Sequence, residues 1–178
     1  MPPRLFVAHV DAFGVVPLTW WAALILVCGL VLTAAVVRPF TAVTGWRPIP
    51  TAATGVWLAV TAALTLGPGN LSPDERAGCA VPDDSTADVL IELGHSLEGA
   101  LNAVLLLPLG VTLVLASRRA LVPGAVVVVL PGLVELAQLF VPGRFCSLTD
   151  FVLNAAGGLV GVGFGVGAVL LRQSRRDT

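Results

Sequence analysis

The residues of this chain that could do chemistry gather in one stretch, over residues 131–161. Within twenty residues the stretch holds two carboxylic acids, two side-chain amides and one guanidinium group, namely Glu135, Gln138, Arg144, Asp150 and Asn154. The sequence around them is strongly apolar. Polar groups in or beside a membrane are costly unless they are paired, so a cluster of this kind marks a candidate functional site.

These groups suit more than one kind of site. In a binding site, the arginine fork would hold a phosphate or carboxylate, the amides would supply directional hydrogen bonds and the acids would orient the arginine. The ligand-binding candidates are Asn102, Glu135, Gln138, Arg144, Asp150 and Asn154. In a membrane enzyme acting on a lipid-linked substrate, Glu135 or Asp150 would instead serve as a general base. A third interpretation is structural: Glu135, Arg144 and Asp150 form a buried ion network, which would be strongly destabilised by losing one member.

A metal site is a weaker alternative. His95 and Glu98, together with the two acids of the cluster, would offer mostly oxygen ligands to a divalent cation. The sequence shows no Ser-His-Asp spacing, phosphate-binding loop or thiolate motif, so we expect no cofactor.

The elements that position the cluster follow from composition. The 178-residue chain is 56% hydrophobic and 12% charged, with a mean hydropathy of +0.93, whereas a soluble domain carries about a quarter charged residues. This composition predicts an integral membrane protein surrounded by lipids. The net charge of −1 argues against a nucleic-acid partner. Nothing soluble in the chain is large enough for a second core, so we expect a single membrane domain over residues 1–178.

Five apolar stretches predict an all-α, polytopic membrane bundle of about five transmembrane helices. About 20 apolar residues suffice to cross the ~30 Å hydrocarbon core. The predicted spans cover residues 17–37, 51–66, 101–117, 120–140 and 150–171, and Pro108 with Gly110 should kink the third. An acidic loop over residues 67–98 separates the second and third spans, and its latter part is expected to be helical.

The last span carries a stripe of glycines. Gly157, Gly161 and Gly165 recur every four residues, a spacing that lets helix backbones approach closely in lipid. We expect tight packing within the bundle, with a dimer seam as the alternative.

The arginines predict the orientation. Seven of the ten lie on the face that holds the first loop, the Arg118–Arg119 loop and the tail. The positive-inside rule then places the N-terminus outside and the C-terminus in the cytoplasm of a multi-pass cell-membrane protein. The acidic loop and the polar cluster fall on the exterior side, where they should form a polar pocket at the outer leaflet.

Two cysteines also fall on the exterior side. Cys79 and Cys146 lie on the two exterior loops, where disulfides persist. We expect a bridge that ties the acidic loop over the pocket, with two unpaired thiols as the alternative. Cys28 is expected to be buried in the first helix.

The polar residues also spell a recognisable pattern. Glu135 and Gln138 form E-x-x-Q, and residues 144–161 read R-x-x-S-x-x-D-x-x-x-N-x-x-G-x-x-x-G. Asn102, followed by Pro108 and Gly110, supplies an earlier block. The combination resembles the signature of the VanZ-like family of small membrane proteins, over a core of about residues 88–165.

The resemblance implies a function in the cell envelope. The family is named for a protein linked to low-level resistance to teicoplanin, a lipoglycopeptide antibiotic that acts outside the cytoplasmic membrane. From this resemblance we expect a lipid, a lipid-linked molecule or a glycopeptide as the ligand at the outer leaflet, with the membrane enzyme as the alternative function.

Overall fold

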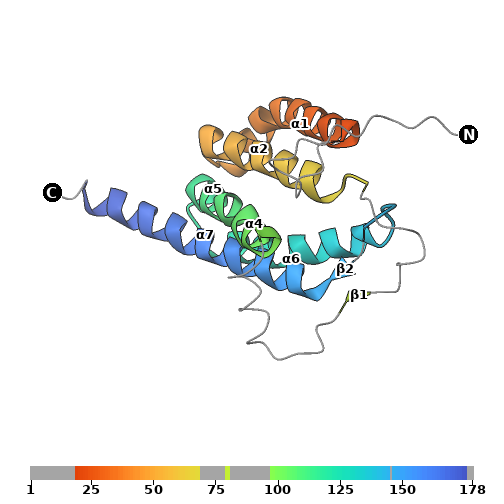
Figure 1. The fold of residues 1–178 in the computed structure, drawn as a ribbon. Helices are drawn as coiled ribbons and strands as arrows, with labels where there is room; N and C mark the ends of the chain where they lie inside the picture. The colour runs from red at the N-terminus through yellow and green to blue at the C-terminus, as the bar shows by residue number, and fades with distance from the viewer. Residues whose placement is uncertain (1–18, 69–78, 81–96, 145, 176–178) are drawn as a thin grey trace, which may run out of the picture.

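The structure, a computed structural model, describes residues 19–68, 79–80, 97–144 and 146–175. In this part of the chain, five helical stretches are long and apolar enough to cross a membrane, as predicted. Successive stretches run in opposite directions and pack as a bundle (Figure 1). The fold is therefore an all-α, polytopic membrane bundle.

The first span is helix α1, Trp20–Thr44. It begins after Thr19, whose hydroxyl oxygen accepts a hydrogen bond from a backbone N–H of the first turn at 3.3 Å. It ends at Gly45, whose φ of 70° lies in the left-handed region that favours glycine. The two ends of α1 are thus fixed by ordinary capping residues.

Two expectations for this helix were wrong. The sequence predicted that Arg38 and Pro39 close the span, but the helix continues through Pro39. Proline removes one backbone hydrogen bond, and the hydroxyls of Thr41 and Thr44 add bonds to backbone carbonyls in the last turns. Cys28 is exposed rather than buried, because α1 is the outermost helix and packs mainly against α2.

Helix α2 covers Pro48–Thr65 and starts with proline, whose fixed φ suits the first helical turn. Close contact with α1 depends on glycines, because a Cβ at Gly29 would collide with Ala59 and a Cβ at Gly55 with Thr33. The opposite side of α2 packs against α5. The α1–α2 pair therefore joins the remaining spans through α2.

The third span is broken, as predicted. It consists of α4, Leu97–Leu105, and α5, Leu107–Ser117, with the interruption at Leu106. The break leaves the Leu105 carbonyl oxygen to accept a hydrogen bond from the indole N–H of Trp57 on α2. The helical segment predicted before Leu97 lies outside the described residues.

Helix α6 covers Leu121–Gln138 and helix α7 covers Leu148–Ser174. Between them, β2 (Cys146–Ser147) pairs in parallel with β1 (Cys79–Ala80), a short pairing that the sequence did not predict. The predicted disulfide joins Cys79 to Cys146 across this pair. The loop after α2 is thereby fastened to the turn that precedes α7.

The glycine stripe of α7 packs against other helices of the same chain. A Cβ at Gly157 would collide with the carbonyl oxygen of Ala103 on α4, and a Cβ at Gly161 with that of Leu107 on α5. At Gly165 the nearest atom would be the Cβ of Val114, at 2.7 Å. The stripe therefore brings α7 against both halves of the third span, as expected for packing within the bundle.

The apolar core lies around α5, which packs against α7 on one side and α2 on another. Its buried side chains are Leu106, Leu109, Leu113, Val114, Val127 and Val162. The last turn of α2, the first turns of α4 and α7 and the last turn of α6 meet at one end of the bundle (Figure 1). This end carries the polar cluster.

Candidate ligand-binding site

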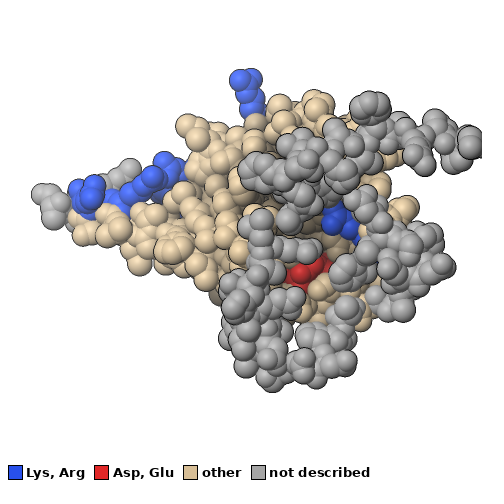
Figure 2. All heavy atoms as spheres, in the orientation of Figure 1, with Lys and Arg blue, Asp and Glu red and all other residues tan. Residues whose placement is uncertain are grey.

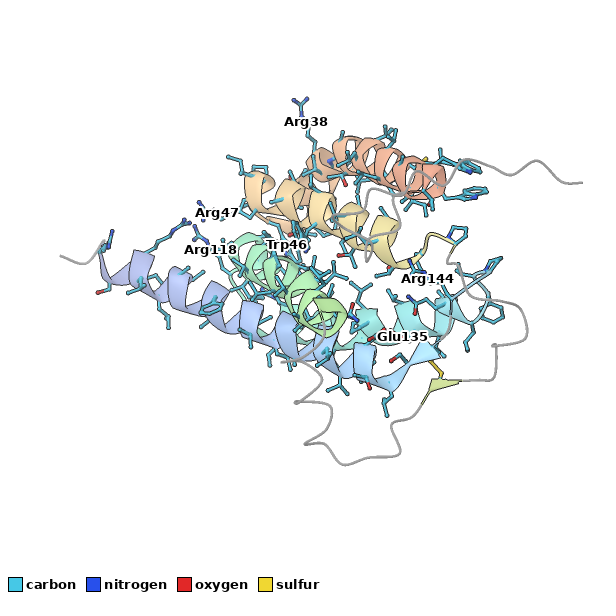
Figure 3. All side chains as sticks on the ribbon, in the orientation of Figure 1. Arg38, Trp46, Arg47, Arg118, Glu135 and Arg144 are labelled. Carbon is cyan, nitrogen blue, oxygen red and sulfur yellow. A yellow bond between two sulfur atoms is a disulfide. The ribbon has the colours of Figure 1, made fainter. Side chains whose placement is uncertain are left out.

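The six polar residues predicted as ligand-binding candidates all line one cavity. It has a volume of about 310 Å³ and is bounded by α2, α4, α6, the turn after α6 and the start of α7. Figure 3 shows Glu135 on α6 and Arg144 on that turn, at the same end of the bundle. The polar lining residues are Thr65, Asn102, Glu135, Gln138, Arg144, Asp150 and Asn154.

Glu135 connects α6 to the start of α7. Its side chain is buried, and Oε2 accepts a hydrogen bond from the backbone N–H of Ser147 at 2.7 Å. Ser147 is also the N-cap of α7, because its hydroxyl oxygen accepts a bond from the Asp150 N–H at 3.2 Å. Cys146, the residue before Ser147, forms the disulfide with Cys79. Glu135 is thus bonded to the N-cap residue of α7 at the side of the cavity.

Arg144 and Gln138 both donate to carbonyls at the C-terminal end of α2 and just after it. Arg144 donates from Nε to the Gly67 oxygen at 3.0 Å and from Nη2 to the Leu64 oxygen at 2.9 Å. Gln138 donates from Nε2 to the Thr65 oxygen at 3.0 Å. The last carbonyls of a helix have no intrahelical partner, and cationic side chains near them are favourable. The two side chains therefore cap α2 from α6 and the following turn.

One pair of the predicted ion network is not formed. Glu135 and Arg144 form no ion pair with each other, although both are described and both line the cavity. Glu135 bonds to the turn before α7, whereas Arg144 bonds to α2. The hydrogen bonds shown for Glu135 and Arg144 thus go to backbone groups at the junctions between helices.

Asn154 is a buried amide of the site, as is Gln138. It is 7% exposed, and its Nδ2 donates to the Asp150 carbonyl oxygen at 2.9 Å. Its Oδ1 has no hydrogen-bond partner among the described residues. A buried polar atom without a partner is uncommon in native proteins and calls for an explanation. Here the atom belongs to a residue that lines the cavity.

The rest of the cavity wall is apolar and was not predicted. It comes from α2, α4 and α6 through Trp57, Val60, Leu64, Leu101, Val104, Leu105 and Val134. Trp57 was the one residue that could have indicated this wall from the sequence, because an indole N–H within an apolar span requires a hydrogen-bond partner. From the sequence, the polar residues were expected at the outer ends of the last three spans, and α2 was not expected to form a wall of the cavity.

The charged surface is divided between the two ends of the molecule. Figure 2 shows an acidic and a basic surface close together at the end that holds the cavity, and further basic surfaces elsewhere. Figure 3 places Arg38, Arg47 and Arg118 at the opposite end from Glu135 and Arg144. The cavity therefore combines both signs of charge, whereas the opposite end carries arginines.

The remaining predictions for the site have different outcomes. Both candidate bases, Glu135 and Asp150, line the cavity, and their catalytic function stays a prediction. His95 and the Glu98 side chain lie outside the described part of the chain. Among the residues that are described, no three His, Cys, Asp or Glu side chains come together as metal ligands would.

Comparison with known proteins gives one match. A family model described as VanZ/LLP1 matches residues 20–171. No curated protein and no solved structure matches the chain. The family match includes the first two spans and is thus longer than the 88–165 core indicated by the motifs.

Proposed function

The chain belongs to the VanZ/LLP1 family, and from this premise we propose that it binds the polar head of an amphipathic ligand in the cavity described above. The ligand is a membrane lipid or a lipid-linked precursor of the cell envelope, taken from the outer leaflet. The chain is a membrane protein by its five membrane-length helices; the ligand and its side of the membrane are parts of the proposal.

The observation that supports this function is that the cavity lining has a polar part and an apolar part. Six polar side chains from α4, α6, α7 and the turn after α6 face the same space as an apolar wall from α2, α4 and α6. Binding pockets combine an apolar lining with a few convergent polar groups. A molecule with a polar head and an apolar chain fits both surfaces at once.

The apolar wall also indicates where the chain of the ligand would lie. Leu101 and Val104 of α4 line the cavity and are exposed at 43% and 57%. In a bilayer, this surface of α4 would face lipid. An acyl or prenyl chain could therefore stay in the membrane while the head occupies the polar part of the cavity.

The proposed side of the membrane rests on the arginines. Of the described arginines, Arg144 lies at the cavity, and the others lie near the end of α1 and just after it, in the loop after α5 and at the end of α7. The positive-inside rule puts those segments in the cytoplasm. The cavity then opens at the outer leaflet, which is the side on which teicoplanin acts, and a bound envelope precursor would connect the fold to glycopeptide resistance.

Filling the lipid-facing part of the cavity tests the proposal. We expect Leu101→Trp to lower the amount of lipid that co-purifies with the protein, measured by mass spectrometry, by at least about tenfold, or ~1.4 kcal/mol. Leu133→Trp on α6 is the matched control, because Leu133 is 57% exposed and does not line the cavity. In a host lacking the gene, only Leu101→Trp should remove any protection against teicoplanin. Equal lipid retention by the two variants would contradict the proposal.

A further inference from the structure

We infer that a groove between α1 and α2 is a second lipid site, which holds one acyl chain of an anionic phospholipid while Arg47 and Arg118 bind its phosphate. The groove has a volume of about 330 Å³ and shares no described lining residue with the cavity. Figure 3 places the two arginines at the opposite end of the bundle from the cavity. The inference therefore does not depend on the ligand proposed for the cavity.

The groove follows one face of each of the two helices. Helix α1 lines it with Leu32, Val36 and Phe40, and α2 lines it with Thr54 and Leu58. Positions four apart share a helix face. At 1.5 Å per residue, the stretch from Leu32 to Phe40 is ~12 Å long, which is close to half of the ~30 Å hydrocarbon core. The groove thus has about the length of one leaflet.

The lining of the groove is apolar although it contains threonines. Each of their hydroxyls donates to the carbonyl oxygen four residues earlier in the chain, at 2.8 to 2.9 Å; these residues are Thr33, Thr51 and Thr54. Leu32 and Leu58 are 63% and 37% exposed, so the groove opens on the surface of the bundle. In a bilayer that surface faces lipid, and the occupant that fits is an acyl chain.

One end of the groove lies at the loop between α1 and α2. Trp46 lines this end and packs edge-on against Phe40, with 5.2 Å between the ring centroids. Tryptophan is enriched at the level of the lipid head groups. The next residue, Arg47, donates its backbone N–H to the Ala116 carbonyl oxygen at the end of α5, at 3.1 Å. The head of a lipid whose chain lies in the groove is therefore next to Arg47.

Arg118 lies at the same end of the bundle, two residues after Ala116. Its backbone N–H donates to the Val114 carbonyl oxygen at 2.8 Å, so its place at the end of α5 is fixed. Figure 3 shows the side chains of Arg47 and Arg118 at this end, with Arg38 farther away on α1. Because both backbones are already held by hydrogen bonds, little ordering is needed when a ligand binds.

Both guanidinium groups lack a partner in the part of the chain that the structure describes: neither Arg47 nor Arg118 has a side-chain hydrogen bond or ion pair there. The described carboxyl groups of Glu135 and Asp150 line the cavity instead. A guanidinium group binds a phosphate through parallel N–H donors. Two such groups beside an apolar groove match an anionic head that is joined to an apolar chain.

Two phospholipids with the same dioleoyl chains test this inference. Phosphatidylglycerol has a net negative charge, whereas phosphatidylcholine balances its phosphate with a cation. Titration of the purified full-length protein, followed by native mass spectrometry, should give a Kd at least about tenfold lower for phosphatidylglycerol. The preference should persist in Leu101→Trp, which alters the cavity and not the groove. Equal Kd values for the wild type, or loss of the preference in Leu101→Trp, would overturn the inference.

The variants Arg47→Gln and Arg118→Gln test the contacts to the phosphate. Each should raise the Kd for phosphatidylglycerol at least about fivefold, because a charge-assisted contact is lost. Arg47→Gln keeps the backbone bond to Ala116. Arg38→Gln is the matched control, because it removes the same charge at an exposed position that does not line the groove. Equal effects of the three variants would show a general attraction to positive charge and would contradict the site.

The variant Leu58→Trp tests the position of the acyl chain. Leu58 and Leu30 are 37% and 38% exposed, and of the two only Leu58 lines the groove. Leu58→Trp should therefore raise the Kd for phosphatidylglycerol at least about fivefold, and Leu30→Trp should not. An equal concentration of glycerol phosphate, which has the phosphate without the chains, should not displace the lipid.

Two results would show that no chain lies in the groove. One is equal binding by Leu58→Trp and Leu30→Trp, and the other is displacement of the lipid by glycerol phosphate. The comparison of the two phospholipids on the wild-type protein needs no variant, so it stays decisive if a variant folds poorly.

Discussion

Arg144 stabilises the junction between the turn after α6 and the end of α2. Its planar guanidinium places two donors on two carbonyl oxygens of the same helix end, a geometry that the single ammonium group of lysine cannot reproduce. The sequence predicted Arg144 as a ligand-binding residue; the structure shows that it lines the cavity, and its part in binding stays a prediction. Its partners could not be predicted, because they are backbone atoms 77 and 80 positions away in the chain.

The variant Arg144→Lys should therefore destabilise the protein although it keeps the charge. We expect the free energy of unfolding to fall by about 1–2 kcal/mol, because at least one bond to an α2 carbonyl is lost. Thermal unfolding in detergent measures the change. Arg119→Lys, at an exposed position outside the site, is the control and should shift stability by less than about 0.5 kcal/mol. Equal effects would show that Arg144 does not cap α2.

Among the elements, α7 determines how closely the bundle packs. It contacts α4, α5 and α6, and its glycines allow the backbones of α4 and α5 to approach. Small residues in this pattern were visible in the sequence, and so was the broken third span. The sequence did not decide whether these glycines face another helix of the same chain or a second copy of the protein. The spacing of the glycines alone carries no information about the surface that they contact.

Substitutions within α7 should separate packing glycines from others. Gly161→Ala is expected to lower the free energy of unfolding by about 1–3 kcal/mol, because its Cβ would collide with the Leu107 backbone. At Gly163 the position of a Cβ is open, so Gly163→Ala should be neutral or stabilising by up to ~1 kcal/mol. Melting temperatures of the two variants in one detergent provide the comparison. A Gly161→Ala protein as stable as Gly163→Ala would contradict this packing.

At the scale of the whole molecule, the two ends differ in character. One end holds the cavity, the disulfide and the short strand pair, and the other holds most of the described arginines (Figure 3). This division was predictable, because successive spans run in opposite directions. The end of one span and the start of the next must therefore lie at the same end of the bundle. The bonds from the end of α2 to Gln138 and Arg144 were not predictable, since they join residues 73 to 80 positions apart.

The proposed orientation can be tested with reporters. Green fluorescent protein fused after the last residue should fluoresce in a bacterial host and alkaline phosphatase at the same site should be inactive, because the arginine-rich end stays in the cytoplasm. Fusions after Pro68, which follows α2, serve as the control and should give the reverse result. Active phosphatase at the C-terminal site would place the cavity on the cytoplasmic side.

The disulfide has a consequence for the order in which the protein is made. Cys79 and Cys146 are separated by 67 positions, and the third and fourth spans lie between them. In the proposed orientation, Cys79 reaches the oxidising side once the second span has inserted, but Cys146 reaches it only after the third and fourth spans have crossed. When Cys79 leaves the ribosome, Cys146 has not yet been synthesised. Every molecule with the disulfide is therefore one in which the fourth span has been inserted. A partly inserted chain keeps a free thiol, which cellular quality control can recognise.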